Sequence, residues 1–207
     1  MKHGGRERVE RRLAAILAAD VAGYSRLIGA DEEGTLERLK AVRSELVDPK
    51  IAERRGRIVK TTGDGLLVEF RSVVYAVRCA VELQREVIAR NTATPAERRI
   101  EFRMGINVGD ILIEDGDIFG DGVNIAARLE ALAVPGGICL SAAAHEQVRD
   151  KLDVAFDDLG EQQVKNITRP VRTYRIALGA PSGAALPVGA PLPLPDKPSL
   201  AVLPFKT

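Results

Sequence analysis

The chain has 207 residues, 45% of them hydrophobic and 29% charged, a balance typical of a folded domain and not of a disordered segment. Lys and Arg number 30 against 29 Asp and Glu, and the resulting net charge of +1 argues against a nucleic-acid or membrane-surface binder. No stretch approaches the ~20 apolar residues of a membrane span, and the polar N-terminal segment does not resemble a secretory signal. The composition predicts a cytoplasmic α/β protein.

The two cysteines, Cys79 and Cys139, each stand alone in an apolar stretch. Such isolated cysteines are typical of buried thiols in a reducing compartment, so neither a disulfide nor a metal site is expected of them. The two histidines, His3 and His145, have no partners at the spacing of metal ligands. None of these four residues is expected to carry chemistry.

Composition shifts divide the chain into four parts: a charged N-terminal segment over 1–12, a body over 13–178, a linker over 179–198 and a terminal run over 199–207. The linker holds six prolines, which forbid a helix or a central strand. The terminal run is apolar and typical of a strand, so we interpret it as the start of a truncated following domain. The alternative is a tail strand that docks on the body.

Within the body, strand and helix patterns alternate. In the first half they predict a buried strand over 13–19, a helical segment from Asp31 closed by Gly56, strands over 57–61 and 66–70 joined by a hairpin turn, and a helix that Ser72 caps. In the second half they predict a strand of period two from Ile100 to Asn107, strands over 110–113 and 138–141, helices over 123–132 and 145–152, and a hairpin over 154–176. The order β-α-β-β-α-β, followed by an αβαββ extension, predicts a ferredoxin-like sandwich with helices on one sheet face.

Two carboxylates occupy positions suited to a metal ion. Asp20 ends the first strand before a glycine-containing turn into a helix, and Asp64 lies between two glycines at the tip of the hairpin. Antiparallel packing could bring the two together as oxygen ligands for Mg²⁺ or Mn²⁺. From spacing alone the alternative is stronger, because Asp-Gly is a common turn dipeptide and a strand-end Asp often caps a helix.

An amide and a guanidinium share one helix face. Asn124 and Arg128 are four residues apart, so they are neighbours on a helix that is otherwise rich in alanine. The pair would suit a phosphate or a developing oxyanion, although an ordinary solvated or interface face is the commoner explanation. The cationic residues Lys60, Arg103 and Lys165 each lie on an apparent strand and are individually ambiguous.

Each motif is ambiguous alone, but the five motifs in their order along the chain are specific to one protein family. The motifs in question are Asp20-Val-Ala-Gly-Tyr-Ser25, Lys60-Thr-Thr-Gly-Asp64-Gly, Phe102-Arg-Met-Gly-Ile-Asn-Val-Gly109, Asp117-Ile-Phe-Gly-Asp-Gly-Val-Asn124-Ile-Ala-Ala-Arg128 and Val164-Lys165-Asn-Ile. In this order, over residues 13–178, they resemble the class III nucleotidyl cyclase catalytic domain. The arrangement is most similar to bacterial adenylate cyclases with a Pro-rich linker and further C-terminal domains, often tetratricopeptide repeats.

The resemblance implies a role for each of these residues. It implies that Asp20, Asp64 and the Val21 carbonyl hold two divalent metal ions, and that the backbone N–H groups of Gly23, Tyr24 and Ser25 contact the phosphates. It assigns Arg103 and Lys165 to the triphosphate, Asn124 to the ribose and Arg128 to charge at the α-phosphorus. It places Lys60 and Asp117 at the purine edge, and it implies a homodimer with two interfacial sites.

The implied activity is conversion of ATP to 3′,5′-cyclic AMP and pyrophosphate. Adenine presents an acceptor at N1 and a donor at its 6-amino group, which match a lysine and a carboxylate, whereas guanine presents the reverse. Two alternatives stay open at this point: a guanylate cyclase, which Lys60 and Asp117 oppose, and a non-catalytic nucleotide-sensing or dimerisation module that regulates a C-terminal domain.

Overall fold

The structure is a computed structural model that describes residues 10–164, 167 and 169–178. Most of the N-terminal segment 1–12, the expected linker 179–198 and the expected start of a further domain at 199–207 lie outside these residues, as does Lys165. The strands are β1 (Glu10–Val21), β2 (Arg57–Thr62), β3 (Gly65–Phe70), β4 (Phe102–Glu114), β5 (Asp117–Phe119), β6 (Ile138–Ser141), β7 (Ala155–Gln162) and β8 (Val171–Ala177). The helices are α1 (Tyr24–Ala30), α2 (Glu32–Val42), α3 (Asp48–Glu53), α4 (Val73–Asn91), α5 (Asp121–Leu132) and α6 (Ala142–Val148), with a π-helical turn η1 (Arg43–Val47) and a 3-10 turn η2 (Ala96–Arg98).

One sheet organises these elements. Its strand order is β2-β3-β1-β4-β6-β8-β7, and β5 pairs with β4 off this path. The long strand β1 is antiparallel to both β3 and β4, whereas β6 runs parallel to β4. The first part, β1, the helices α1 to α3, the β2–β3 hairpin, α4 and β4, has the predicted β-α-β-β-α-β order. The mixed α/β prediction is therefore confirmed.

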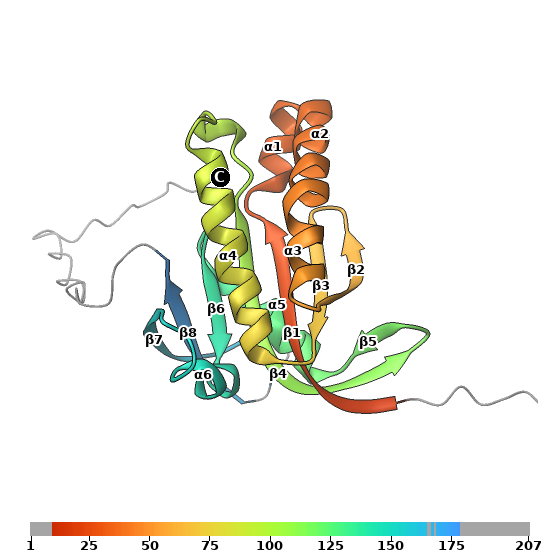
Figure 1. Cartoon of the computed structure of the whole chain (residues 1–207), viewed down its shortest axis with the longest axis vertical. Helices are drawn as coiled ribbons and strands as arrows, with labels where there is room; N and C mark the ends of the chain where they lie inside the picture. The colour runs from red at the N-terminus through yellow and green to blue at the C-terminus, as the bar shows by residue number, and fades with distance from the viewer. Residues whose placement is uncertain (1–9, 165–166, 168, 179–207) are drawn as a thin grey trace, which may run out of the picture.

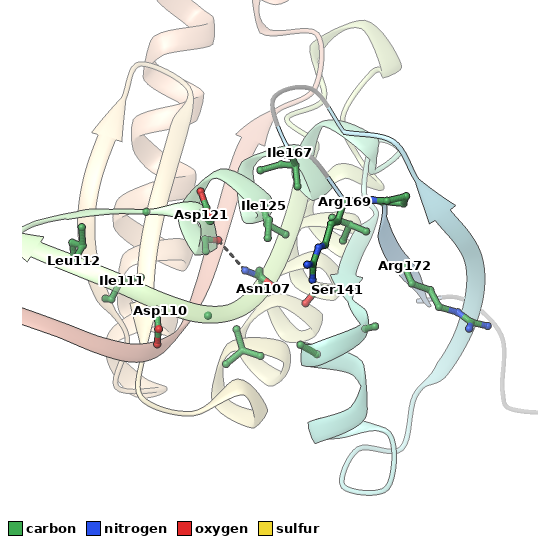
Figure 2. A pocket seen from close by; sticks show the side chains of 18 of the residues that line it. Asn107, Asp110, Ile111, Leu112, Asp121, Ile125, Ser141, Ile167, Arg169 and Arg172 are labelled. Carbon is green, nitrogen blue, oxygen red and sulfur yellow. Dashed lines mark hydrogen bonds between the residues drawn. The ribbon is translucent and has the colours of Figure 1, made fainter.

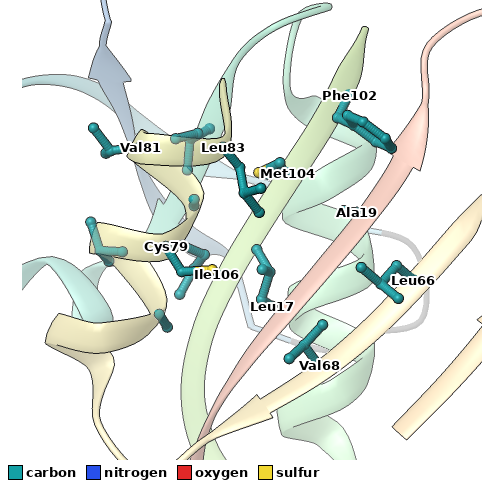
Figure 3. Close-up of a cluster of buried hydrophobic side chains, with 14 of the residues drawn as sticks. Leu17, Ala19, Leu66, Val68, Cys79, Val81, Leu83, Phe102, Met104 and Ile106 are labelled. Atoms are coloured by element: carbon teal, nitrogen blue, oxygen red, sulfur yellow. The ribbon is translucent and has the colours of Figure 1, made fainter. Parts of the chain in front are cut away.

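The side chains of β1 alternate between two apolar layers, as a pleated strand requires. Leu17 and Val21 face the larger layer, which includes residues of α2, α3, α4 and α6 and is drawn in part in Figure 3. Ile16 and its neighbours two residues away face the opposite layer, which includes Ala126 of α5. In Figure 1, α1 to α4 lie in front of the sheet and α5 lies behind it. The ferredoxin-like part thus keeps its helices on one face, and α5 of the extension covers the other.

Several predicted boundaries were wrong. The helix expected over 145–152 lies at Ala142–Val148 (α6), because the side chain of Ser141 accepts from the N–H of Ala144 and so begins the helix earlier. The two strands expected over 100–107 and 110–113 form the single strand β4. The twelve-residue β1 supplies pairing partners along this length, including Ala14 opposite Gly109. The helical segment expected up to Gly56 is divided by η1, where the N–H of Asp48 donates to the carbonyl five residues earlier. The next residue, Pro49, has no N–H to continue the regular pattern.

The predicted buried thiols are confirmed, because Cys79 and Cys139 are both buried and free. No helix in the part of the chain that the structure describes is long and apolar enough to cross a bilayer.

Candidate active site

The end of β1 and the tip of the β2–β3 hairpin meet at one cleft of about 370 Å³. Asp20 and Asp64 both line it, although 44 residues separate them in the sequence. The antiparallel pairing of β1 with β3 produces this convergence, because it sets Ala19 opposite Leu66 and so places the end of β1 beside the hairpin. The structure therefore brings together the two carboxylates that the sequence singled out.

A guanidinium neutralises one of these carboxylates. Arg103 lies opposite Asp20 on β4, and its Nε and Nη2 donate to the two carboxylate oxygens at 2.9 and 2.5 Å. The hydrogen bond to Asp20 holds the pKa of Arg103 above its usual value. Such a bidentate pair is geometrically specific and occupies both oxygens of Asp20.

Glu130 is a third carboxylate at this cleft, and the sequence reasoning missed it. Its Oε1 lies 3.4 Å from Nη2 of Arg103, and the side chain is 14% exposed. Burial, reinforced by a hydrogen bond and the negative charge of Asp20, raises the pKa of Glu130 to about 8. In the sequence Glu130 looks like an ordinary charge near the end of a helix.

Gly105 explains why Glu130 reaches the cleft. A Cβ at Gly105 would lie 2.1 Å from the backbone nitrogen of Glu130 and 2.2 Å from the carbonyl oxygen of Ala126. Only glycine lets α5 lie this close to β4. The glycine in Phe102-Arg-Met-Gly is thus the one sequence signal that could have led to Glu130.

The donor set at this cleft suits a hard divalent cation. Asp20 and Asp64 supply carboxylate oxygens, the ligands that Mg²⁺ prefers, and the backbone carbonyl of Val21 follows directly after Asp20. Arg103 contacts both oxygens of Asp20, so a bound cation competes with this guanidinium for the carboxylate. Oε1 of Glu130 is buried without a hydrogen-bond partner and lies 3.4 Å from Nη2 of Arg103, so it is placed to accept a hydrogen bond from the guanidinium once Asp20 binds a cation.

The two residues expected at the purine edge touch each other. Nζ of Lys60 on β2 donates to Oδ2 of Asp117 on β5 at 3.1 Å. The N–H of Ile118 donates to the other oxygen, Oδ1, at 2.8 Å. These two hydrogen bonds, led by that of Ile118, hold the pKa of Asp117 below its ordinary value. The structure thus sets a hydrogen-bond donor beside an acceptor at this position.

Asn124 and Arg128 do not line the cleft of Asp20 and Asp64. The side of α5 that borders this cleft carries Val123, Ala127 and Glu130. Asn124 and Arg128 occupy a neighbouring stripe, turned away from the buried residues Gly122, Ala126 and Leu129 that face the sheet. Asn124 is exposed and Arg128 is half-buried.

A second cleft of about 920 Å³ lies on the other side of that stripe (Figure 2). Asp121, Gly122 and Ile125 of α5 border it, and Nδ2 of Asn107 donates to the carbonyl of Gly122 at 3.0 Å within it. Ile167 also lines this cleft. Asn124 and Arg128 thus stand between two clefts, on a surface open to a second molecule.

The turn after Asp20 begins α1. Gly23 adopts a left-handed backbone, with φ of 67°, and its carbonyl accepts from the N–H of Arg26 and of Leu27. The N–H groups of Gly23, Tyr24 and Ser25 precede the first regular turn, so they have no acceptor within the helix. The turn thus presents three donors just past the end of β1.

Comparison with known protein families shows which family the chain belongs to. Residues 9–177 match the profile of the adenylate and guanylate cyclase catalytic domain. The chain belongs to this family. The match covers every strand and helix that the structure describes, and it includes the lining of both clefts.

Two curated relatives extend the comparison. The chain is 50% identical over 205 residues to the Rhizobium meliloti protein "Putative adenylate cyclase 3", covering 97% of this chain and 34% of that one. It is 34% identical over 142 residues to an adenylate cyclase of Streptomyces coelicolor, covering 69% of this chain and 35% of that one. The cyclase domain spans about a third of the length of these relatives.

Solved structures agree with the fold. The adenylate/guanylate cyclase/hydrolase of Silicibacter pomeroyi is 54% identical with a TM-score of 0.78, covering 82% of this chain and 98% of that one. An adenylyl cyclase of P. aeruginosa shares the fold at 24% identity, with a TM-score of 0.70 and coverage of 82% and 96%.

Proposed function

We propose that this cyclase domain is an adenylate cyclase, which converts ATP to 3′,5′-cyclic AMP and pyrophosphate. The observation that carries the proposal is the contact of 3.1 Å between Lys60 and Asp117. The names of the two relatives, "Putative adenylate cyclase 3" in Rhizobium meliloti and "Adenylate cyclase" in Streptomyces coelicolor, point in the same direction.

The pair favours adenine by hydrogen-bond polarity. The ammonium of Lys60 donates to the acceptor N1, and the carboxylate of Asp117 accepts from the 6-amino group. Guanine presents a donor at N1 and an acceptor at O6, so both protein groups would lose their hydrogen bonds. Leaving a hydrogen-bonding site unpaired costs more than a missing apolar contact, so the discrimination is strong.

Asp20, Asp64 and the carbonyl of Val21 are the proposed ligands of two divalent cations, Mg²⁺ or Mn²⁺. When bound, such ions favour loss of the proton of the 3′-hydroxyl and neutralise charge on the triphosphate. The amides of Gly23, Tyr24 and Ser25 bind phosphate oxygens beside the end of β1.

Four further side chains bind the substrate or stabilise the transition state in this proposal. Arg103 and Lys165 hold the triphosphate, and Asn124 orients the ribose so that its 3′-oxygen faces the α-phosphorus. The 3′-oxygen forms the new bond there as the bond to the pyrophosphate oxygen breaks. Arg128 stabilises the charge that develops on the α-phosphate oxygens. Substrate phosphates accept the proton, so no protein base is assigned.

We further propose that two copies of the chain share each active site. Asp20 and Asp64 line one cleft, whereas Asn124 and Arg128 occupy a stripe of α5 that does not border it. One copy therefore supplies the metal ligands, and the other supplies Asn124 and Arg128. Lys60 lines the cleft of Asp20 and Asp64 within a single copy, so the assignment of Lys60 and Asp117 to the second copy rests on the family resemblance alone. A symmetric homodimer then holds two complete sites.

Product analysis tests the activity. The purified domain is given ATP or GTP with Mn²⁺, and cyclic AMP, cyclic GMP and pyrophosphate are measured by chromatography and mass spectrometry. Cyclic AMP formed with one pyrophosphate each is the expected result. Predominant cyclic GMP from GTP would instead make the domain a guanylate cyclase, and no cyclic product from either would favour a nucleotide-sensing or dimerisation module.

A double substitution tests whether Lys60 and Asp117 select the base. The double variant Lys60→Glu, Asp117→Cys exchanges the donor for an acceptor and removes the carboxylate. It should lose ATP turnover and shift its preference toward GTP. Wild-type selectivity in this variant would show that the pair does not read the base.

A further inference from the structure

Glu69 on β3 is a charged side chain inside the protein. It is 3% exposed and lies opposite Arg57 of β2 in the strand register. Nε and Nη2 of Arg57 both donate to Oε2 of Glu69, at 3.0 and 2.7 Å, and Nη2 of Arg12 lies 2.5 Å from Oε1. A buried carboxylate held by two guanidiniums is a rigid point in the sheet, because moving it would leave charges unpaired.

Arg57 also reaches a different part of the molecule. Its remaining terminal nitrogen, Nη1, donates to the carbonyl of Gly116 at 2.7 Å. Gly116 lies in the turn between β4 and β5 and has a φ of 79°. The next residue is Asp117. The guanidinium thus connects the buried Glu69 to the residue immediately before the proposed purine-reading carboxylate, and we name these contacts the Arg57–Glu69 anchor.

Few contacts fix the position of the short strand β5. It has three residues and pairs with β4. The direct contact between Asp117 and Lys60 is half exposed, with side-chain exposures of 29% and 54%. Exposed ion pairs are screened by water and hold their partners weakly, so Lys60 alone does not fix the position of Asp117. In the Arg57–Glu69 anchor, Arg57 is 44% exposed and its bond to Gly116 lies at the surface, but it donates twice to one oxygen of a carboxylate that is 3% exposed. The anchor therefore adds a second contact between β2 and the β4–β5 turn, and its Glu69 end is fixed inside the protein.

Both contacts come from the same strand. Arg57 and Lys60 lie on β2, and they meet consecutive residues, Gly116 and Asp117. The anchor therefore sets the distance between the hydrogen-bond donor and the acceptor that the purine would meet.

We propose that Arg57 and Glu69 are positioning residues for base selection, which hold the β4–β5 turn so that Asp117 stands in register with Lys60. This inference rests on the proposed function, because it assigns these residues to the selectivity of the same site. Neither residue touches the nucleotide.

The test compares Arg57→Met with Arg54→Met. Arg54 also donates twice to a glutamate, to the two oxygens of Glu82 at 3.0 and 2.6 Å, but it connects the end of α3 to α4, and neither of these contacts involves β5. The ratio of kcat/KM for ATP to that for GTP should fall about tenfold in Arg57→Met, the scale of a lost hydrogen bond to a charged group. The loss should come mainly from a higher KM for ATP. Arg54→Met should keep the wild-type ratio.

A second readout needs no turnover. Hydrogen–deuterium exchange of the backbone amides of residues 117–119 should be faster in Arg57→Met than in the wild type, and unchanged in Arg54→Met. Arg57→Lys provides a milder variant if Arg57→Met does not fold, because it keeps the positive charge but cannot span Glu69 and Gly116 together. It should lose selectivity and protection in the same direction.

The outcomes separate the two proposals. If Asp117→Ala changes the ATP:GTP ratio but neither Arg57 variant does, the anchor is not a positioning device and the base-reading assignment stands. An equal fall in Arg57→Met and Arg54→Met would likewise overturn the inference, because it would indicate a general loss of stability. If Asp117→Ala leaves the ratio unchanged, the base-reading assignment fails and the inference about selectivity fails with it.

Discussion

Arg103 and Asp20 are paired through two parallel hydrogen bonds. The arginine proposed to bind the triphosphate is thus held by a carboxylate proposed to bind the metal. The metal ion and the guanidinium of Arg103 therefore compete for the same carboxylate. Binding of metal and nucleotide should therefore be coupled: the metal takes Asp20, and the released guanidinium turns to the phosphates or to Glu130.

Substitution of Arg103 tests this coupling. Without nucleotide, Arg103→Met should bind Mn²⁺ roughly fivefold more tightly than the wild type, equivalent to the ~1 kcal/mol of a partly exposed ion pair. The same variant should bind ATP more weakly, and calorimetric titration measures both. Arg175→Met, which removes two hydrogen bonds to Oδ2 of Asp157 on β7, is the control and should change neither affinity. Unchanged or weaker Mn²⁺ binding in Arg103→Met would contradict the coupling.

Glu130 should make the stability of the metal-free protein depend on pH. Its pKa is raised to about 8 from an ordinary 4.5 because burial favours the neutral form. A carboxyl group with a raised pKa stabilises the fold below pH 4.5, and this contribution is lost as the pH rises toward 8.

Glu130→Gln removes that ionisation. Relative to the wild type, the free energy of unfolding of the variant should therefore increase between pH 5 and pH 9, as measured by denaturant titration without metal. The exposed Glu114 provides the control Glu114→Gln, which should show no such trend. A difference that stays constant with pH would show that Glu130 does not ionise in this range.

Asp64→Ala should abolish metal-dependent turnover, with a fall of at least about a hundredfold, because a proposed metal ligand is lost. The metal-free fold should be nearly as stable as the wild type, within about 0.5 kcal/mol, because the residue lies at a hairpin tip away from the core. Product formation and thermal unfolding are measured on the same sample. A large drop in the melting temperature would favour a structural role for this turn.

The two thiols should be inert in the native protein. Burial raises the pKa of Cys79 to about 12 and that of Cys139 to about 11, so neither forms the reactive thiolate at neutral pH. A chromogenic disulfide reagent should label no thiol in the folded chain and two after denaturation. Rapid labelling of the native protein would contradict the burial of these residues.

The sequence carried much of the fold, because period-two strands and the Gly-Asp-Gly hairpin are local patterns. It could not show that β4 continues through Gly109, because that depends on the length of its partner β1. In the site, the motifs identified Asp20 and Asp64, but the Arg103 pair, the burial of Glu130 and the contact of Arg57 with Gly116 arise from long-range packing. No local spacing encodes such contacts.

The most direct test of a shared ATP site is complementation between two inactive variants. Asp64→Ala and Asn124→Ala are co-expressed with different tags, mixed dimers are isolated in parallel, and cyclic AMP formation from ATP is measured. Random pairing makes half of the dimers mixed, each with one intact site of two, so the co-expressed pool should recover roughly a quarter of wild-type activity. Mixed dimers that form but yield no cyclic AMP would contradict the account.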